Sequence, residues 1–183
     1  MKNKIMVLDD DKFYVEQLNQ MLEERGYDVL ASTVPEKGLE LLESFAPDIL
    51  LVDWRMPNMS GIDIIKMIRG KMHNEEIYII MLSGNIMTDD IVTALSTGAN
   101  DYVIKPFTEE ELVARVNNGI RHKRFQKISA DSRKKILSEL NKLESALQQL
   151  TSALPADNKT STVIRESKNI FASIRETMKS CQN

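Results

Sequence analysis

Short apolar runs alternate with amphipathic stretches along the first 122 residues of the chain. The runs are rich in Ile, Leu, Val and Met, as expected for buried strands, and they occupy 4–8, 27–31, 48–53, 77–82 and 101–104. After each run, apolar residues recur at helical spacing, over 12–25, 35–45, 62–68, 88–95 and from Thr108 onwards. This strict alternation predicts a doubly wound α/β fold, in which helices cover both faces of a five-stranded parallel sheet.

Residues that start or stop helices mark several of the predicted boundaries. In the first helix the apolar positions are Phe13, Leu18, Met21 and Leu22, and a glycine at 26 ends it. Prolines at 35 and 47 open and terminate the second helix. Thr108 is followed three residues later by a glutamate, which is the pattern of a capping box for the fifth helix.

The hydrophobic pattern changes beyond residue 122, and all seven glycines of the chain lie before this point. Apolar residues then recur at alternating spacings of four and three, as in the seam of a coiled coil: Ile136, Leu140, Leu143, Leu147, Leu150 and Leu154. Pro155 ends this helix, a polar linker is predicted over 156–160, and a weaker stripe follows at Val163, Ile170, Ile174 and Met178. We expect an all-α hairpin over 123–183. Two hairpins can form a four-helix bundle, so a homodimer is predicted.

Charge divides the chain at the same place. Residues 123–183 carry 12 of the 24 Lys and Arg but only 6 of the 27 Asp and Glu, a formal charge of +6. Residues 1–122 carry the other 12 and 21, hence −9. The basic tail allows nucleic-acid binding, but the apolar seam is the stronger signal and favours a protein partner. We therefore predict two regions, 1–122 and 123–183.

Composition limits the class of protein. Hydrophobic residues make up 42% of the chain, enough for a packed core. A single cysteine, Cys181, excludes an intramolecular disulfide framework and suits a reducing compartment. The N-terminus lacks the apolar segment of a signal peptide, and the apolar runs are too short to span a bilayer. A cytoplasmic protein without membrane contact is expected.

Polar side chains follow four of the five predicted strands. Asp9 and Asp10 follow the first, Asp53 closes the third, Ser83 follows the fourth and Lys105 follows the fifth. Right-handed crossovers place these strand ends on one edge of a parallel sheet, where such folds bind ligands. Clustered carboxylates repel one another, and a cation such as Mg²⁺, which prefers oxygen ligands, would stabilise their ionised forms. A carboxylate beside Mg²⁺ can attack phosphorus and form an aspartyl phosphate.

Four motifs in this order resemble the receiver domain of two-component response regulators over about residues 1–122. They are Leu8-Asp9-Asp10, Asp53 with Met56-Pro57 and Gly61, Met81-Leu82-Ser83-Gly84, and Tyr102-Val-Ile-Lys105-Pro106-Phe107. The resemblance implies a flavodoxin-like sheet of strand order 2-1-3-4-5. It also implies a phosphoacceptor signalling protein rather than an enzyme, phosphorylated by a sensor histidine kinase or phosphotransfer protein and acting on a downstream protein partner.

The resemblance assigns roles to individual residues. It implies that Asp53 is the phosphoacceptor and that Asp9, Asp10 and Asp53 hold Mg²⁺ together with the backbone carbonyl of Arg55. The run of three acids from Asp9 permits a shift of one residue, and we place the pair at 9 and 10 because the apolar run ends at residue 8. The third acid then falls at the start of a helix, where negative charge is favourable.

The remaining roles concern the phosphoryl group and the switch. The resemblance implies that Lys105 contacts the phosphoryl group and that its peptide bond with Pro106 is cis. The Ser83 hydroxyl would bond the phosphoryl group, and the aromatic ring of Tyr102 would change rotamer in response.

Two other functions remain open. One is a transcriptional or RNA-binding regulator whose small output domain is unrecognised. The other is a hydrolase of the aspartyl-phosphate class, which is disfavoured because that class usually has an acid two residues after the nucleophile, where this chain has Arg55.

Overall fold

The computed structural model describes residues 2–70, 77–84, 87–153 and 158–180 of the chain. Leu154 of the predicted seam and Cys181 lie outside the described residues, as does the side chain of Met178. The chain divides into two compact units, Met1–Arg124 and Phe125–Asn183. Within the described residues, no helix is both long and apolar enough to cross a membrane.

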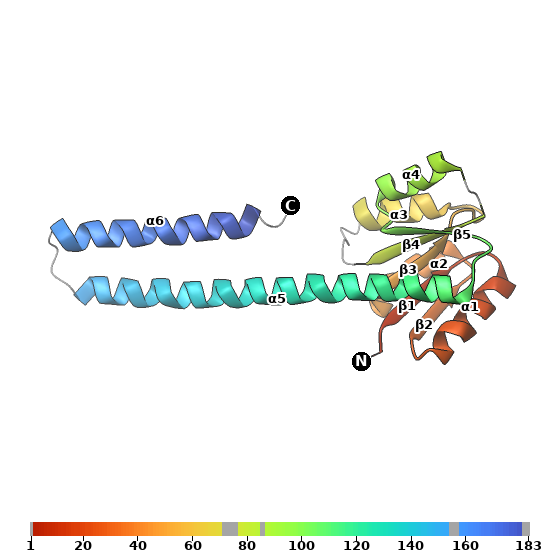
Figure 1. Cartoon of the computed structure of the whole chain (residues 1–183), viewed down its shortest axis with the longest axis horizontal. Coiled ribbons are helices and arrows are strands. Elements are labelled where there is room, and N and C mark those ends of the chain that lie inside the picture. Colours follow the sequence, from red (N-terminus) through yellow and green to blue (C-terminus); the bar gives the residue numbers. More distant parts are fainter. Residues whose placement is uncertain (1, 71–76, 85–86, 154–157, 181–183) are drawn as a thin grey trace. The chain divides into compact units, whose positions relative to one another are not determined.

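The first unit is built on one parallel five-stranded sheet with the order β2-β1-β3-β4-β5 (Figure 1). Its strands are β1(Lys4–Leu8), β2(Asp28–Ser32), β3(Ile49–Asp53), β4(Tyr78–Ser83) and β5(Asp101–Ile104). β1, β3 and β4 are almost entirely buried, as expected for strands covered on both faces. The predicted doubly wound fold and strand order are confirmed.

Six helices occupy the stretches where helical spacing is found in the sequence. They are α1(Lys12–Glu24), α2(Pro35–Phe45), α3(Gly61–Gly70), α4(Thr88–Thr97), α5(Glu109–Ala153) and α6(Asn158–Ser180). The Asp11 carboxylate caps α1 by accepting hydrogen bonds from the backbone N–H groups of Phe13 and Tyr14. The Thr108 hydroxyl accepts one from the Glu111 N–H at 3.2 Å, which is half of the predicted capping box.

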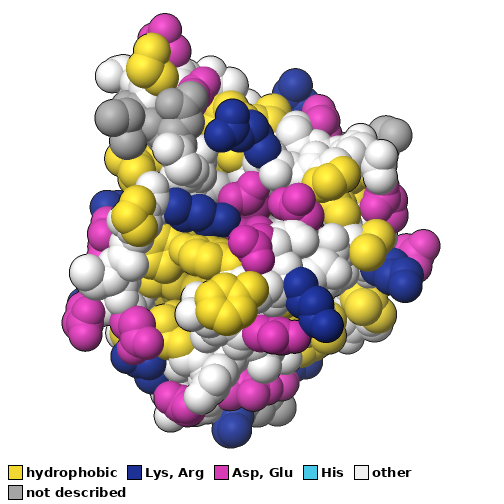
Figure 2. All heavy atoms as spheres, turned by 90° about the vertical axis from the view of Figure 1, so that its right-hand side faces the viewer, with side chains coloured by type: hydrophobic (Ala, Val, Ile, Leu, Met, Phe, Trp, Pro, Cys, Tyr) yellow, Lys and Arg dark blue, Asp and Glu magenta, His cyan; other side chains and the backbone are white. Residues whose placement is uncertain are grey.

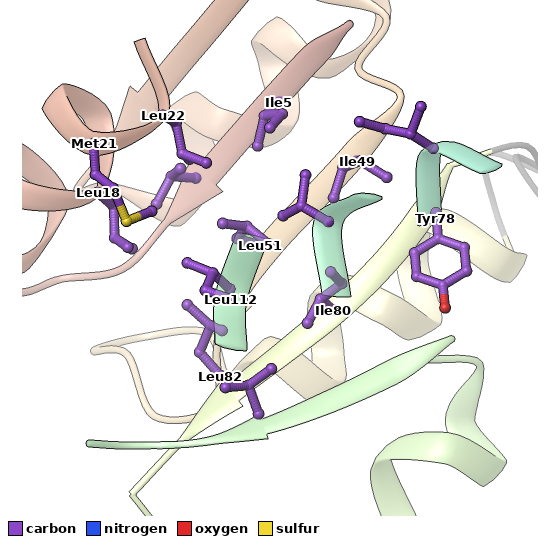
Figure 3. Packing of buried hydrophobic residues seen from close by; sticks show 14 of the residues in the cluster. Ile5, Leu18, Met21, Leu22, Ile49, Leu51, Tyr78, Ile80, Leu82 and Leu112 are labelled. Atoms are coloured by element: carbon purple, nitrogen blue, oxygen red, sulfur yellow. The ribbon is translucent and has the colours of Figure 1, made fainter. Parts of the chain in front are cut away.

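The sheet separates two hydrophobic cores. On one face α1 and the start of α5 cover β1, β3 and β4, with Leu18, Leu22 and Leu112 packed against the strands (Figure 3). On the other face the second core takes its buried side chains from α2, α3 and α4, among them Leu42 and Ile65. Of the four apolar positions named for the first helix, Leu18, Met21 and Leu22 are buried together with Val15, whereas Phe13 is 69% exposed.

In the second unit, residues 125–153 of α5 pack against α6 in an antiparallel hairpin. The Arg175 guanidinium near the end of α6 donates hydrogen bonds to Asn141 and Glu144 of α5. Further along, a groove between the helices is lined by residues of both helices: Glu144, Leu147, Gln148, Thr151, Ile164, Lys168 and Phe171. Residues 158–160, predicted as part of a linker, already belong to α6 because the helix begins at Asn158.

Two residues of the apolar row predicted for α6 lie outside the groove that faces α5. Val163 and Ile170 are each 60% exposed, whereas the groove is lined by the next residue in each case, Ile164 and Phe171. The seam predicted for α5 is similarly divided. Leu140 is buried and Leu147 lines the groove, but Ile136, Leu143 and Leu150 are each more than half exposed.

Candidate functional site

The polar side chains expected at the strand ends lie on one edge of the sheet. Asp9 directly follows β1, Asp53 closes β3, Ser83 closes β4 and Lys105 directly follows β5. Because these four strands are parallel and adjacent, their carboxyl ends bring the side chains together. Figure 2 views this side of the molecule and shows acidic side chains gathered around a basic one, beside a hydrophobic patch.

Lys105 lies at the centre of the cluster. Its ammonium is 2.5 Å from Oδ2 of Asp9 and 2.6 Å from Oδ1 of Asp53, and its side chain is only 20% exposed. Burial alone lowers the pKa of this ammonium, but hydrogen bonds and charge interactions with Asp53 and Asp9 outweigh burial, so the pKa is raised. Lys105 therefore remains protonated near neutral pH and supplies a fixed positive charge between the two carboxylates. Its peptide bond with Pro106 is cis, the isomer that the resemblance implies.

Asp9 and Asp10 have different environments. Asp9 is buried, and its Oδ1 accepts a hydrogen bond from the backbone N–H of Asp11 at 3.0 Å. Burial raises the pKa of Asp9, and the nearby charge of Asp53 acts in the same direction, against the effect of Lys105. Asp10 is exposed at the same edge. The third acid, Asp11, is engaged as the cap of α1.

The loop after β3 holds Asp53 in place. The Asp53 Oδ2 atom accepts a hydrogen bond of 2.7 Å from the backbone N–H of Arg55, whose side chain is exposed. The loop then folds back, so that the Gly61 N–H donates to the carbonyl of Trp54. A Cβ atom on Gly61 would lie 2.3 Å from the backbone oxygen of Asp53. Glycine at 61 thus allows the first turn of α3 to approach the candidate phosphoacceptor closely.

Ser83 and Tyr102 lie in neighbouring strands. Ser83 is 2% exposed at the end of β4, and its carbonyl accepts a hydrogen bond from the Lys105 N–H. Tyr102 in β5 is also buried, and its ring makes an edge contact with Trp54, with 6.5 Å between ring centroids. Trp54 directly follows Asp53 and is the only tryptophan in the chain. The expected switch aromatic therefore touches the residue next to the candidate phosphoacceptor.

One aromatic residue of the site was not predicted from the sequence. The Lys105 ammonium lies 4.2 Å from the ring centroid of Tyr14, on the first turn of α1, a cation–π contact. Phe107 meets the same ring edge-on at 5.8 Å. Burial and the neighbouring Asp9, Asp53 and Asp11 charges raise the pKa of Tyr14, so its phenol remains neutral. Helical spacing alone suggests only a core position for this tyrosine, because its partner lies 91 residues away.

The donor set of the site fits Mg²⁺ in chemistry. Asp9, Asp10 and Asp53 offer carboxylate oxygens and the Arg55 peptide offers a carbonyl, all of them hard ligands that suit this ion. Within the described ranges, no three His, Cys, Asp or Glu side chains are gathered as a ready metal site. Two of the carboxylates are instead directed towards Lys105. The residues are of the right kind, and loading the ion requires these oxygens to be shared between Mg²⁺ and Lys105.

Comparison with known proteins identifies relatives over the first unit. The response regulator receiver domain family matches residues 5–117. The DNA-binding response regulator MtrA of Mycolicibacterium smegmatis is 36% identical over 121 residues, which cover 66% of this chain and 52% of that protein. The phosphate regulon transcriptional regulatory protein PhoB of Rhizobium meliloti is 34% identical over 126 residues, covering 69% and 56%. The chain thus spans about half the length of the curated relatives it matches.

Solved structures give the same result. A receiver domain of a Francisella response regulator, 1452, is 31% identical, with a TM-score of 0.62, over 66% of this chain and 98% of that one. A response regulator receiver domain protein from Clostridium thermocellum is 30% identical, with a TM-score of 0.63, over 68% and 98%. The family match ends at residue 117, before the second unit begins.

Proposed function

Because this chain belongs to the response regulator receiver domain family, we propose that it is a cytoplasmic response regulator of a two-component system that accepts a phosphoryl group on Asp53. The donor would be a phosphohistidine of a sensor kinase or phosphotransfer protein. The observation that supports this most directly is the Lys105 ammonium, held 2.6 Å from the Asp53 carboxylate at the edge where four parallel strands end.

The proposed reaction is an in-line transfer. An oxygen of the Asp53 carboxylate attacks phosphorus, an O–P bond forms, and the N–P bond of the phosphohistidine breaks, so that the imidazole leaves with its electron pair and takes up a proton. Phosphoryl transfer depends chiefly on positioning and charge neutralisation. The Arg55 N–H fixes the orientation of the carboxylate, and Lys105 neutralises charge on the phosphoryl oxygens. Bound Mg²⁺, held by Asp9, Asp10, Asp53 and the Arg55 carbonyl, would supply further charge neutralisation.

The proposed signal starts from the charge added at Asp53. A phosphoryl group brings about −1.5 to −2 charges and strong acceptor oxygens to one point of the edge. The Ser83 hydroxyl, at the end of the adjacent strand, would turn to donate to a phosphoryl oxygen, and Tyr102 would change rotamer. The edge contact between Tyr102 and Trp54 supports this coupling, because Trp54 shares a peptide bond with Asp53.

The proposed output is protein association through residues 123–183. This region contains a helical hairpin in the structure and lies beyond the family match. Its exposed aliphatic residues favour association with a second copy or with a downstream protein.

Labelling of the phosphoacceptor tests the proposal. The full chain is incubated with a radiolabelled small acyl phosphate and Mg²⁺, and covalent label is measured. Asp53→Asn should abolish the label, because an amide is not a nucleophile here. Asp28→Asn, at the exposed start of β2, is the matched control and should label normally. Undiminished label on Asp53→Asn would refute the assignment.

A second candidate function is DNA-binding transcriptional regulation, favoured by the description of the MtrA relative as DNA-binding. That match covers only 52% of the relative, and the basic tail of the present chain folds as two helices. Titration of random duplex DNA at increasing salt distinguishes the two functions. Binding that weakens steeply with salt supports this alternative, whereas no binding at low salt favours protein association.

A further inference from the structure

The hairpin of the second unit leaves one row of aliphatic side chains uncovered on each helix. The rows are Ile136, Leu143 and Leu150 on α5, and Val163, Ile170 and Ile174 on α6. Their side chains are 38–64% exposed. We call these six residues the apolar stripe. Large aliphatic residues that are exposed together on one face, rather than scattered singly, mark an interaction surface.

The two rows lie on the same side of the hairpin. On α5, Leu143 and Leu150 each precede by one position a residue that lines the groove between the helices, Glu144 and Thr151. On α6, Val163 and Ile170 similarly precede Ile164 and Phe171. One position corresponds to a rotation of about 100°.

The two helices run antiparallel. Viewed from one end of the hairpin, a step back of one residue turns clockwise on one helix and anticlockwise on the other. Both rows are therefore turned towards the same face of the hairpin. The direction of the helices follows from Arg175, late in α6, which bonds Asn141 and Glu144 early in this part of α5. The stripe is therefore one surface formed by two helices.

We infer that the apolar stripe binds the same stripe of a second copy of this chain, so that two hairpins form a four-helix bundle. This inference rests on the proposed role of residues 123–183 in protein association. In such a bundle each helix buries the row that faces its hairpin partner and also the row that is exposed in the protomer. Stable specific interfaces bury about 1,200 Å² or more in total, so the twelve aliphatic side chains of two stripes would form the centre of such an interface, with the residues beside them at its rim.

Charge beside the stripe supports a second copy as the occupant. The six side chains are uncharged, so the same patch can pair with itself across a two-fold axis. Glu139, between Ile136 and Leu143 on the helix surface, forms an ion pair of 2.7 Å with Lys142 of its own helix. Identical faces can thus approach without net repulsion at this point.

Sedimentation equilibrium of the full chain tests the inference. The wild type should sediment at twice the chain mass of 20.9 kDa at micromolar concentration. The double variant Leu143→Gln/Ile170→Gln should raise the dimer dissociation constant at least a hundredfold, because four aliphatic contacts are lost per dimer. Both residues are exposed in the protomer, so helical circular dichroism should remain unchanged.

Leu137→Gln is the matched control, since Leu137 is also a partly exposed leucine of α5 but lies on the other flank of the packed row. It should leave the dimer intact. A monomeric wild type would overturn the inference and assign the stripe to an amphipathic helix of a different protein. Equal loss of dimer in the control and the double variant, or no loss in either, would also overturn it.

The same double variant should accept phosphoryl label on Asp53 at the wild-type level. Normal labelling with no dimer in the wild type would refute the interface alone. A dimer that cannot be labelled would refute the phosphoacceptor function and leave the interface standing.

Discussion

The edge of the sheet and the face of the hairpin depart from ordinary protein architecture in opposite ways. At the edge, ionisable groups are buried: Asp9 and Asp53 are almost inaccessible and share the Lys105 ammonium. On the hairpin, aliphatic groups such as Leu150 are exposed. Burial of charge costs free energy unless the charge is paired, and exposure of apolar surface forgoes the hydrophobic gain. Each departure marks a candidate binding surface.

The two surfaces suit different kinds of ligand. A cluster of two buried carboxylates and one ammonium is suited to a compact, highly charged ligand, because its groups are fixed before the ligand arrives. The apolar stripe has no such chemical preference, and its selectivity comes from shape and length along two helices. We therefore propose that the edge of the sheet receives the chemical input and that the hairpin serves in protein association.

Apart from the tests described above, the largest effect is expected for a core substitution in the hairpin. It tests whether the stability of the second unit is independent of the function of the first. Leu140 is buried in the second unit, on the row of α5 that includes the groove-lining Leu147. Leu140→Ala should lower the free energy of unfolding of the hairpin by about 2–3 kcal/mol, because it removes buried methyl groups and leaves a cavity. Urea unfolding followed by circular dichroism measures this loss.

Phosphoryl labelling of the same variant gives the comparison. It should match the wild type, because Asp53 belongs to the other unit. A labelling defect as large as the stability defect would contradict the division between input and association. Leu137→Ala, at a 38% exposed leucine of the same helix, is the control and should have a much smaller effect on unfolding.

A smaller effect is expected from substituting the buried Asp9. It tests how much free energy the burial of this carboxylate costs at the edge of the sheet. Burial raises the pKa of Asp9, so the folded state favours its protonated form. The stability that protonated Asp9 contributes is fully present below pH 3.8, the pKa of this carboxyl in the unfolded chain. It is lost as the pH rises through the raised pKa of the folded protein. Asp9→Asn should therefore be more stable than the wild type at pH 7, by about 1 kcal/mol, and this advantage should vanish at low pH.

Urea unfolding of wild type and Asp9→Asn at several pH values between 4 and 8 measures this difference. Asp10→Asn is the control, since Asp10 is exposed and its substitution should be nearly neutral. A variant that is less stable than the wild type at pH 7 would mean that pairing with Lys105 outweighs burial.

The smallest effect concerns the aromatic support of Lys105. Tyr14→Leu removes the ring that lies 4.2 Å from the ammonium and should slow labelling by a small acyl phosphate about threefold, since an exposed or half-buried cation–π contact contributes roughly 0.5–1 kcal/mol. Tyr14→Phe retains the ring and should retain the rate. If the phenylalanine variant is as slow as the leucine variant, the hydroxyl group matters and the cation–π interpretation is wrong.

Much of the fold could be predicted because each local pattern agrees with the global one. Apolar runs closed by polar residues, and prolines and glycines at helix ends, place every strand within about one residue of its observed bounds. Spacing alone does not say which apolar residues of a helix are buried. Phe13 is an apolar position of α1 but is 69% exposed, whereas Val15 packs inward, because the approach of α1 to the sheet sets the rotation of the helix.

The strand and helix order, and the acids, hydroxyl and lysine at the strand ends, could be predicted from the amino-acid pattern alone. These follow from spacing and residue type, which are local properties. The three-dimensional fold was needed to reveal that Lys105 joins Asp9 to Asp53, that Tyr14 supports it, and that Asp11 is engaged as a helix cap. It also decided which half of the α5 seam α6 covers. Such pairings depend on contacts between residues distant in the chain, and a one-dimensional pattern does not fix them.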